Sequence, residues 1–520
     1  MKLRPILLSA LCAAALAMPV NAEDLMIGVG GTATSIDPHF YNASPNNSIA
    51  MQIFDRLTER DASGQLLPGL AERWEAVGEL QWRFLLRPDI KWHDGEAFTA
   101  DDVVFTFDRA RDVPNSPGGF GGFLRAVASV EAADDATVLI TTKAPAPNLP
   151  GDLANIAIVS RHAGEGADTS DYNSGKAAIG TGAFRFKEFR QGDQITLERN
   201  PDWWGHDVAW DTVTYRVISS AGGRTTAMLA GDVDIIDTPA AADLERLRST
   251  AGISVDSTPG LRVIYLVGSP LTGAQMQFIR GPNGEDLSEN PLADVRVRKA
   301  LSIALNRQAI VDRIMEGTAT ASGQWLPEGA FSYSPDIAVP EQDAEAAKAL
   351  LAEAGYPDGF RLTVHVPNDR YPNAPAVVQA VAQMWTRIGV QTTVESLPWI
   401  TYSAKMSEFA IKLLGLGNAT FDASSMLINV LGTADKERGL GASNDSGYSN
   451  PKLDEMTAAA LSIYDDAQRE QALIAAVKLA LEDGAILPLY QQTNTWAMRE
   501  GLTYAPRIDE RTLAKDIMVK

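Results

Sequence analysis

The chain has 520 residues, 45% of them hydrophobic, and 66 acidic side chains against 45 basic ones give it a formal net charge of −21. This hydrophobic content excludes an intrinsically disordered chain, and the length predicts two or three structural units. So negative a surface repels phosphate backbones, which argues against nucleic acid as a partner. The single cysteine excludes a disulfide framework.

The first residues have the parts of a secretory signal peptide. Two basic residues precede an apolar run over residues 6–18, and Ala22 is a small residue at a cleavage position. The run is shorter than the roughly 20 apolar residues that cross a bilayer. Cys12 leaves with this segment and follows a leucine, which argues against a lipid anchor. We therefore predict a signal peptide over 1–22 and a soluble, periplasmic mature protein.

Short strands are expected in the first half of the mature chain. Runs rich in β-branched and aromatic residues stand at 82–86, 137–142 and 212–218, separated by Gly, Pro and Asp. The texture is β-richer here than further along the chain.

Strands and helices alternate between residues 343 and 394. Asp343 can cap a helix through 354, and residues 360–366 then alternate apolar and polar side chains as a half-buried strand does. Apolar residues at helical spacing follow over 374–388, and a second strand is expected at 390–394. This order is a β-α-β unit, which predicts a parallel sheet covered by helices. Further helices are expected at 294–306 and 466–483.

No motif nominates catalysis, a cofactor or a metal. Residues 28–33 fit a loose dinucleotide pattern, but the following Ser-Ile-Asp-Pro does not open a helix, so we predict a strand end there. The five histidines are scattered without metal-ligand spacing, and phosphate loops and nucleophile elbows are absent. We expect neither a catalytic site nor a bound cofactor or metal.

Short motifs over nearly the whole mature chain resemble the extracytoplasmic solute-binding proteins of family 5, which include dipeptide-, oligopeptide-, nickel- and glutathione-binding proteins. The matching segments keep the expected order, and collinear agreement over some four hundred residues is not expected by chance. They stand at 35–38, 52–57, 67–74, 82–87, 90–95, 98–105, 180–184, 199–204, 231–234, 294–300, 354–359, 448–451 and 486–490.

The resemblance implies an α/β fold, namely a two-lobed periplasmic-binding-protein clam-shell (type II, cluster C) with an extra subdomain on the first lobe. The expected boundaries are lobe I at 23–57, 175–262 and 495–520, its additional subdomain at 58–174, and lobe II at 263–494. Most motif residues are structural in this picture, and we expect Trp74, Trp82, Phe84 and Phe105 to be core aromatics.

The function implied is that of the substrate-binding component of an ABC importer. It would hold an oligopeptide or peptide-like solute between the lobes and deliver it to the permease in the inner membrane, as a monomer and without chemistry. Two alternatives remain open. The cargo could be an opine, a glutathione-like conjugate, a sugar or a metal chelate, or the chain could be a secreted hydrolase or chaperone-like protein.

Ligand contacts are expected from loops that follow predicted strands and face the cleft, especially loops with aromatic or isolated polar side chains. The candidate ligand-binding residues are Tyr41, Asn42, Arg262, Tyr265, Arg370, Tyr371, Trp399, Tyr402, Asn418 and Asp422. For the aromatic ones, packing within their own lobe is an equal alternative.

The loop 415–425 departs from the family pattern. In peptide-binding relatives it carries a Trp and an Asp that pairs with the peptide's amino terminus, whereas Leu416 and Ala419 stand at those positions here. Asp422 could bind the amine instead, because a shielded carboxylate forms a strong bond with an ammonium group. It could equally cap the helix that follows.

Overall fold

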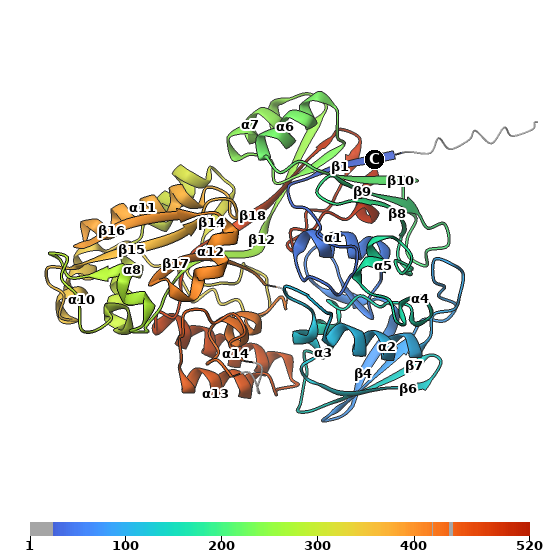
Figure 1. The fold of residues 1–520 in the computed structure, drawn as a ribbon, viewed down its shortest axis with the longest axis horizontal. Coiled ribbons are helices and arrows are strands. Elements are labelled where there is room, and N and C mark those ends of the chain that lie inside the picture. Colours follow the sequence, from blue (N-terminus) through green and yellow to red (C-terminus); the bar gives the residue numbers. More distant parts are fainter. Residues whose placement is uncertain (1–23, 419, 436–439) are drawn as a thin grey trace, which may run out of the picture.

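The computed structural model describes residues 24–418, 420–435 and 440–520. The predicted signal peptide lies outside these residues. The described chain forms two lobes joined by two long strands, β12 (Ile253–Gly268) and β18 (Leu487–Arg499), which cross the waist between the lobes (Figure 1). Lobe I is the half that holds β1 and α1, and lobe II is the half that holds β15 and α11. The predicted two-lobed α/β fold is confirmed, while the exact residue boundaries of its parts stay a prediction.

One 12-stranded sheet of the described chain runs through both lobes. Its remaining strands are β1 (Asp24–Val29), β8 (Phe184–Arg190), β9 (Gln194–Arg199), β10 (Thr212–Val217), β11 (Ile235–Asp237), β13 (Ile279–Arg280), β14 (Ala319–Ala321), β15 (Phe360–Pro367), β16 (Val390–Leu397) and β17 (Ile411–Gly417). Along the main path the order is β13-β15-β17-β12-β18-β11-β1-β10-β9-β8. The register of β12 on β18 shifts between Pro259 and Val263. Because such irregularities bend and twist a strand, the sheet turns at the waist and contributes one part to each lobe.

Lobe I packs around the strands on the β1 side of the sheet. Its core includes the buried rings of Phe184, Trp210 and Trp496. The Trp210 indole donates to the carbonyl of Ile517 over 2.7 Å, so the end of the chain returns to this lobe. The helices and small sheet here are α1 (Ser44–Ile53), α4 (Arg161–Gly164), α5 (Thr169–Asn173), α6 (Ala221–Ala230), α7 (Leu244–Ser249), β19 (Leu502–Thr503) and β20 (Met518–Val519).

A separate four-stranded sheet, in the order β4-β5-β7-β6, lies below the main sheet of lobe I in Figure 1. Its own core holds Phe84 and Phe107, and the capping box of Thr99 and Asp102 starts the helix that covers it. The elements are β2 (Thr58–Arg60), β3 (Leu66–Pro68), β4 (Ala71–Gly78), β5 (Gln81–Leu86), α2 (Ala100–Arg111), β6 (Val127–Asp134), β7 (Thr137–Thr142) and α3 (Leu149–Leu153).

The predicted β-α-β unit is confirmed in lobe II. Strands β15 and β16 pair in parallel, and α11 (Ala374–Arg387) buries its valines against them. The side chain of Asp343 accepts from the Ala346 N–H over 2.9 Å and thereby caps α10 (Ala344–Glu353). The predicted helix at 294–306 is α8 (Val295–Ile303), and the one at 466–483 is α14 (Asp466–Glu482).

The other helices of lobe II complete its core and a lower cluster that contains α14. They are α9 (Arg307–Ile310), α12 (Trp399–Lys405) and α13 (Pro451–Ala460). The short helical turns of the described chain are η1 (Gly121–Leu124), η2 (Ala241–Asp243), η3 (Ala274–Phe278), η4 (Pro291–Ala293), η5 (Val311–Met315), η6 (Met406–Glu408), η7 (Met426–Val430) and η8 (Ala514–Asp516).

The predicted strands of the first half are confirmed as β5, β7 and β10. Of the four aromatic residues expected in the core, Trp82 and Phe84 are buried, and Trp74 and Phe105 pack against the cores while partly exposed. Within the described chain, no helix combines the length and the apolar character that crossing a bilayer would need.

Candidate functional site

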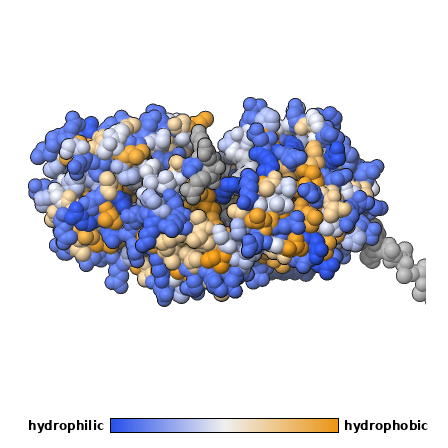
Figure 2. Space-filling model, turned by 90° about the horizontal axis from the view of Figure 1, so that it is seen from below, coloured by the Kyte–Doolittle hydropathy of each residue, from blue (hydrophilic) through white to orange (hydrophobic). Residues whose placement is uncertain are grey.

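A cavity of about 630 Å³ lies between the two lobes. Figure 2 shows the molecule hollowed between its two halves. Lobe I contributes the segment after β1, the start of α1, the ends of β10 and β11, and the C-terminal segment around Glu510. Lobe II contributes residues 369–372 after β15 and Trp399 at the start of α12. The volume falls in the range of 300 to 1,000 Å³ that is usual for small-molecule sites.

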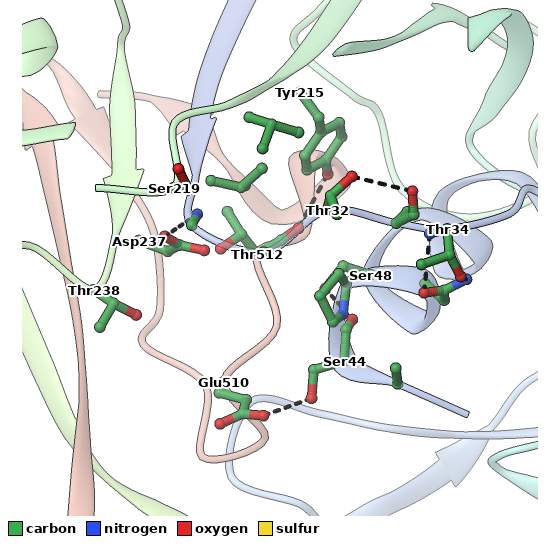
Figure 3. Close-up of a pocket in the computed structure, with 18 of the residues that line it drawn as sticks. Thr32, Thr34, Ser44, Ser48, Tyr215, Ser219, Asp237, Thr238, Glu510 and Thr512 are labelled. Carbon is green, nitrogen blue, oxygen red and sulfur yellow. Dashed lines mark hydrogen bonds between the residues drawn. The ribbon is translucent and has the colours of Figure 1, made fainter. Parts of the chain in front are cut away.

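Hydroxyl groups are abundant on the lobe I wall of this cavity. Figure 3 shows most of them around the pocket, together with the carboxylates of Asp237 and Glu510. The lining hydroxyl residues of lobe I are Thr32, Thr34, Tyr41, Ser44, Ser48, Tyr215, Ser219, Thr238 and Thr512. Some of these hydroxyls already bond within the protein: Ser44 donates to Glu510, Ser48 to the Ser44 carbonyl and Tyr215 to the Thr512 carbonyl. The hydroxyls of Ser219 and Thr238 make no such bond among the described residues, so they can donate to a polar ligand or accept from it.

The predicted site residue Arg262 lies on the cavity wall but is already paired. Its Nε donates to Oε2 of Glu510 over 3.0 Å, and its Nη2 donates to Oε1. The hydroxyl of Ser44 donates to the same Oε1. Burial alone would raise the pKa of Glu510, but the Arg262 guanidinium holds it below its ordinary value. The pair therefore forms a charge-balanced part of the wall.

Arg370 offers an unpaired positive charge on the lobe II wall. Its guanidinium lies 5.5 Å from the ring centre of Tyr371 and 5.6 Å from that of Trp399. Among the described residues, no hydrogen bond or ion pair engages it. The Trp399 N–H donates to Oδ1 of Asp369 over 2.7 Å, which holds the start of α12 beside this loop. Glu510 lies near enough for the charge of Arg370 to help lower its pKa, but no carboxylate of the described residues bonds to Arg370. An arginine beside two aromatic rings can bind an anionic group of a ligand.

A glycine determines how Tyr371 reaches the cavity. A Cβ on Gly415 would come within 2.8 Å of the Tyr371 ring, and the Tyr371 hydroxyl donates to the Gly415 carbonyl over 3.3 Å. The ring can therefore come this close to β17 only because position 415 lacks a side chain.

Five of the ten predicted ligand-binding residues line the cavity, namely Tyr41, Arg262, Arg370, Tyr371 and Trp399. The structure places Tyr265 and Tyr402 in the buried interior of lobe II, where the Tyr402 hydroxyl donates to the Leu413 carbonyl over 2.7 Å. Asn42 accepts from the Asn47 amide instead of facing the cavity. Both tyrosines therefore pack within their own lobe, which was the alternative expected for aromatic side chains.

Asn418 and Asp422 lie in a buried turn beyond β17. Oδ1 of Asp422 accepts from the Ser424 N–H over 2.9 Å, from the Thr420 hydroxyl over 2.7 Å and from the Ser424 hydroxyl. The Asn418 amide donates to the Asp422 carbonyl. This geometry matches the expected capping alternative for Asp422. Leu416 packs on the core of lobe II, and Ala419 lies outside the described residues.

Several cavity residues escaped prediction, among them Ser44, Asp237 and Glu510. Asp237 could have been found from the sequence. It directly follows two isoleucines that come after the Gly-Asp-Val-Asp motif and predict a short strand, and residues at strand ends often bind ligands. No comparable signal marks Glu510, which follows no strand. Within the part of the chain that the structure describes, no three His, Cys, Asp or Glu side chains gather as a metal site would require.

The model of the bacterial extracellular solute-binding proteins, family 5 (middle region), matches residues 65–438. The chain belongs to this family. The family's members bind solutes, which agrees with the resemblance seen in the motifs and with a cavity between two lobes.

The family 5 protein has similar curated relatives over most of its length. It is 27% identical to the dipeptide-binding protein of Escherichia coli K12 over 82% of each chain. It is 28% identical to heme-binding protein A of Haemophilus influenzae, covering 84% of this chain and 80% of the relative. It is also 27% identical to the oligopeptide-binding protein AppA of Bacillus subtilis, covering 96% and 92%.

A solved structure shares the fold of the family 5 protein. The structure of HbpA2 from Haemophilus parasuis superposes with a TM-score of 0.79 at 25% identity, over 96% of this chain and 100% of that one. The fold of this chain is therefore that of a solved structure.

Proposed function

We propose that this protein binds an oligopeptide or peptide-like solute in the cavity between its lobes and delivers it to the permease of an ABC importer. The proposal includes a periplasmic location, secretion through the segment at 1–22 and action as a monomer. The proposed ligand contacts are the five predicted residues on the cavity wall, with Arg370 as the anchor of a ligand carboxylate.

The single observation that carries the proposal is the unpaired Arg370 facing the hydroxyl-rich wall of lobe I. A peptide has a carboxylate at one end and backbone amides and carbonyls along its length. The carboxylate matches Arg370, and the amides and carbonyls match hydroxyl groups that donate and accept. Tyr371 and Trp399 provide flat apolar surfaces for side chains of the ligand.

The two-lobed architecture explains how such a protein can hold and release cargo without chemistry. The lobes are joined through β12 and β18, and the proposed contacts come from both sides of the cavity. Closing the lobes excludes water and strengthens the charge pair and the hydrogen bonds inside. Affinity then depends on the equilibrium between open and closed forms, which a permease that binds one form can shift.

The relatives support a peptide more than another solute. Two of the three curated relatives above are named for a dipeptide or an oligopeptide, and one is named for heme. An opine, a glutathione-like conjugate, a sugar or a metal chelate as cargo is therefore not favoured, and a hydrolase function has no support in a family of solute-binding proteins.

The proposal can be tested on the secreted protein. Mass spectrometry of solutes retained after gentle purification identifies a natural cargo, and tryptophan fluorescence follows titrations with dipeptides and tripeptides. We expect peptides to bind, and both C-terminal amidation of the peptide and Arg370→Gln to weaken binding by about 10- to 100-fold. The control is Arg361→Gln, which removes an exposed arginine of the same lobe outside the cavity. Retention of a non-peptide solute by a protein that ignores every peptide would contradict the proposal.

A further inference from the structure

We propose that Asp237, at the end of β11 in lobe I, binds the amino group of the ligand, so that the ligand lies with its amine on lobe I and its carboxylate on lobe II. This inference rests on the proposed function, since it assigns a second end of the same peptide-like ligand. Loop 415–425 of lobe II, where Asp422 was one of two open alternatives for the amine, would then not be needed for this contact.

One oxygen of the Asp237 carboxylate bonds within the protein, and the other is left for a ligand. Oδ1 accepts from the Gly30 N–H over 2.9 Å and lies 3.3 Å from Nε of Arg224. No hydrogen bond within the described chain engages Oδ2. The side chain is 21% exposed and lines the cavity, and in Figure 3 the carboxylate points toward the open middle of the pocket. An ionised carboxylate has about four acceptor positions, so several remain for a ligand.

Arg224 does not use up this acceptor capacity, because its donors are directed mainly at the backbone. Its Nε donates to the Asp237 carbonyl, Nη1 to the carbonyls of Ile218 and Ser219, and Nη2 to the Thr238 carbonyl. The guanidinium therefore ties together the chain ends of β10 and β11, and Arg224 lines the same cavity as Asp237. A Cβ on Gly30 would approach Nη1 to 2.6 Å, which shows how closely the residue after β1 packs on this arginine.

The charge of Asp237 is incompletely balanced in the absence of a ligand. Burial is the main reason that the pKa of Asp237 lies above its ordinary value, and Glu510 adds to the effect. Arg224 and the Gly30 N–H oppose this change without cancelling it. A ligand ammonium group would stabilise the charged form, since an opposite charge nearby favours ionisation.

The other carboxylates of the cavity are less suited to the amine. Both oxygens of Glu510 accept from Arg262 or Ser44. Asp369 is exposed to solvent and holds the Trp399 N–H, so water screens its charge. Asp422 is only 4% exposed and is absent from the cavity wall. Asp237 alone among these four combines shielding, access and an unused oxygen.

The arrangement predicts which ligand groups matter. The exposed residues Ser219 and Thr238 also line the cavity, and their hydroxyls can accept the remaining ammonium hydrogens. Arg370 lies on the opposite lobe, so a zwitterion bridges the two lobes and favours the closed form. A peptide with a blocked amino terminus would lose the contact between its amine and Asp237 but keep the contact between its carboxylate and Arg370.

The experiment compares a dipeptide that binds the wild-type protein with its N-acetylated form, on wild type and on Asp237→Asn, by calorimetric titration. Asparagine keeps an oxygen for the Gly30 N–H, so we expect the variant to fold. Acetylation of the dipeptide should weaken its binding to the wild-type protein about 10- to 100-fold, and Asp237→Asn should weaken binding of the free dipeptide similarly. Acetylation should then change the affinity of the variant little, because the contact is already lost. Asp232→Asn, which alters an exposed carboxylate just before β11, is the matched control and should behave as wild type.

Two outcomes would overturn the inference and are distinguishable. The first outcome is that the free dipeptide binds, but acetylation weakens binding to Asp237→Asn as strongly as binding to the wild type. Asp237 is then not the amine site, while the peptide function stands. If no peptide binds the wild-type protein at all, the proposed function fails and this inference fails with it. Melting curves of each variant verify that a loss of binding is not a loss of folding.

Discussion

The guanidinium of Arg60 lies 4.3 Å from the centre of the Phe421 ring. Arg60 ends β2 in lobe I, and Phe421 follows β17 in lobe II, so this contact joins the lobes away from the hinge strands. The same guanidinium donates to the Thr420 carbonyl over 3.3 Å. A second such contact runs from the Tyr464 hydroxyl in lobe II to the Glu79 carbonyl in lobe I over 2.8 Å. The lobes therefore touch along one edge of the cleft in addition to the two connecting strands.

Replacing Phe421 should loosen this edge. The residue is 7% exposed and has a φ of +63°, a conformation that costs a non-glycine residue about 1 kcal/mol. We expect Phe421→Ala to lower the free energy of unfolding by about 3 kcal/mol and to expand the protein in small-angle scattering. Phe421→Gly should be about 1 kcal/mol more stable than the alanine variant, because glycine accepts the positive φ. Scattering curves identical to wild type would show that the contact does not hold the lobes together.

Asp152 should make stability depend on pH. Burial, and then the neighbouring Asp422, raise the pKa of Asp152 to about 7, although Arg125 and Arg60 act against this. A raised pKa favours the protonated form, so its stabilising contribution is complete below the ordinary pKa of about 4 and is lost as the pH rises through about 7.

Asp152→Asn should remove this part of the pH dependence, since asparagine stays neutral and can still accept from the Asn148 amide. We therefore expect the variant to be more stable than wild type at pH 8 and similar to it at pH 4, as measured by melting temperature. Equal gains at both pH values would contradict the assignment.

Breaking the pair of Glu510 and Arg262 should lower the stability of the fold. This pair stabilises the fold at high pH, whereas the effect of Asp152 is stabilising at low pH. The pKa of Glu510 lies below its ordinary value, so the pair stabilises the fold above about pH 4.5 and loses this effect as the pH falls. Glu510→Gln leaves Arg262 buried without a carboxylate, and we expect a loss of about 2 to 4 kcal/mol at pH 7 in chemical denaturation. The double variant with Arg262→Gln should recover part of this loss, because no charge is then left unpaired. A double variant as unstable as the sum of the single ones would show that the pair is not coupled.

Gly180 should tolerate no side chain. A Cβ at this position would lie 1.7 Å from the carbonyl oxygen of Ile53, a rigid backbone atom at the end of α1. We expect Gly180→Ala to cost about 3 kcal/mol or more and to reduce the yield of folded protein. Gly222→Ala is the matched control, since nothing lies within 4 Å of its Cβ, and it should stabilise α6 by about 0.5 kcal/mol. Denaturation of both variants measures the contrast.

The candidate site was only partly predictable, for reasons visible in single residues. Arg370 and Trp399 stand just after predicted strands, and local order along the chain was enough to place them near a cleft. Tyr402 comes three residues after Trp399, and one turn of helix sends its side chain inward to the Leu413 carbonyl. An aromatic side chain on such a turn can face the core of its lobe or the cavity. The choice depends on what packs against it in the folded protein, which the hydrophobic periodicity of the sequence does not show.

The sequence by itself determined the family, three strands of the first half and the β-α-β unit and two further helices of lobe II, because collinear motifs and hydrophobic periodicity are local properties of the chain. Only the tertiary structure decided the state of each charge at the cavity. Arg262 lies within β12 and Arg370 follows β15, yet Arg262 bonds to Glu510, 248 residues away along the chain, while no carboxylate of the described residues bonds to Arg370. Pairing over such distances is set by how the chain folds back on itself, and it separates an arginine that already bonds to a carboxylate from one whose hydrogen-bond donors are unused.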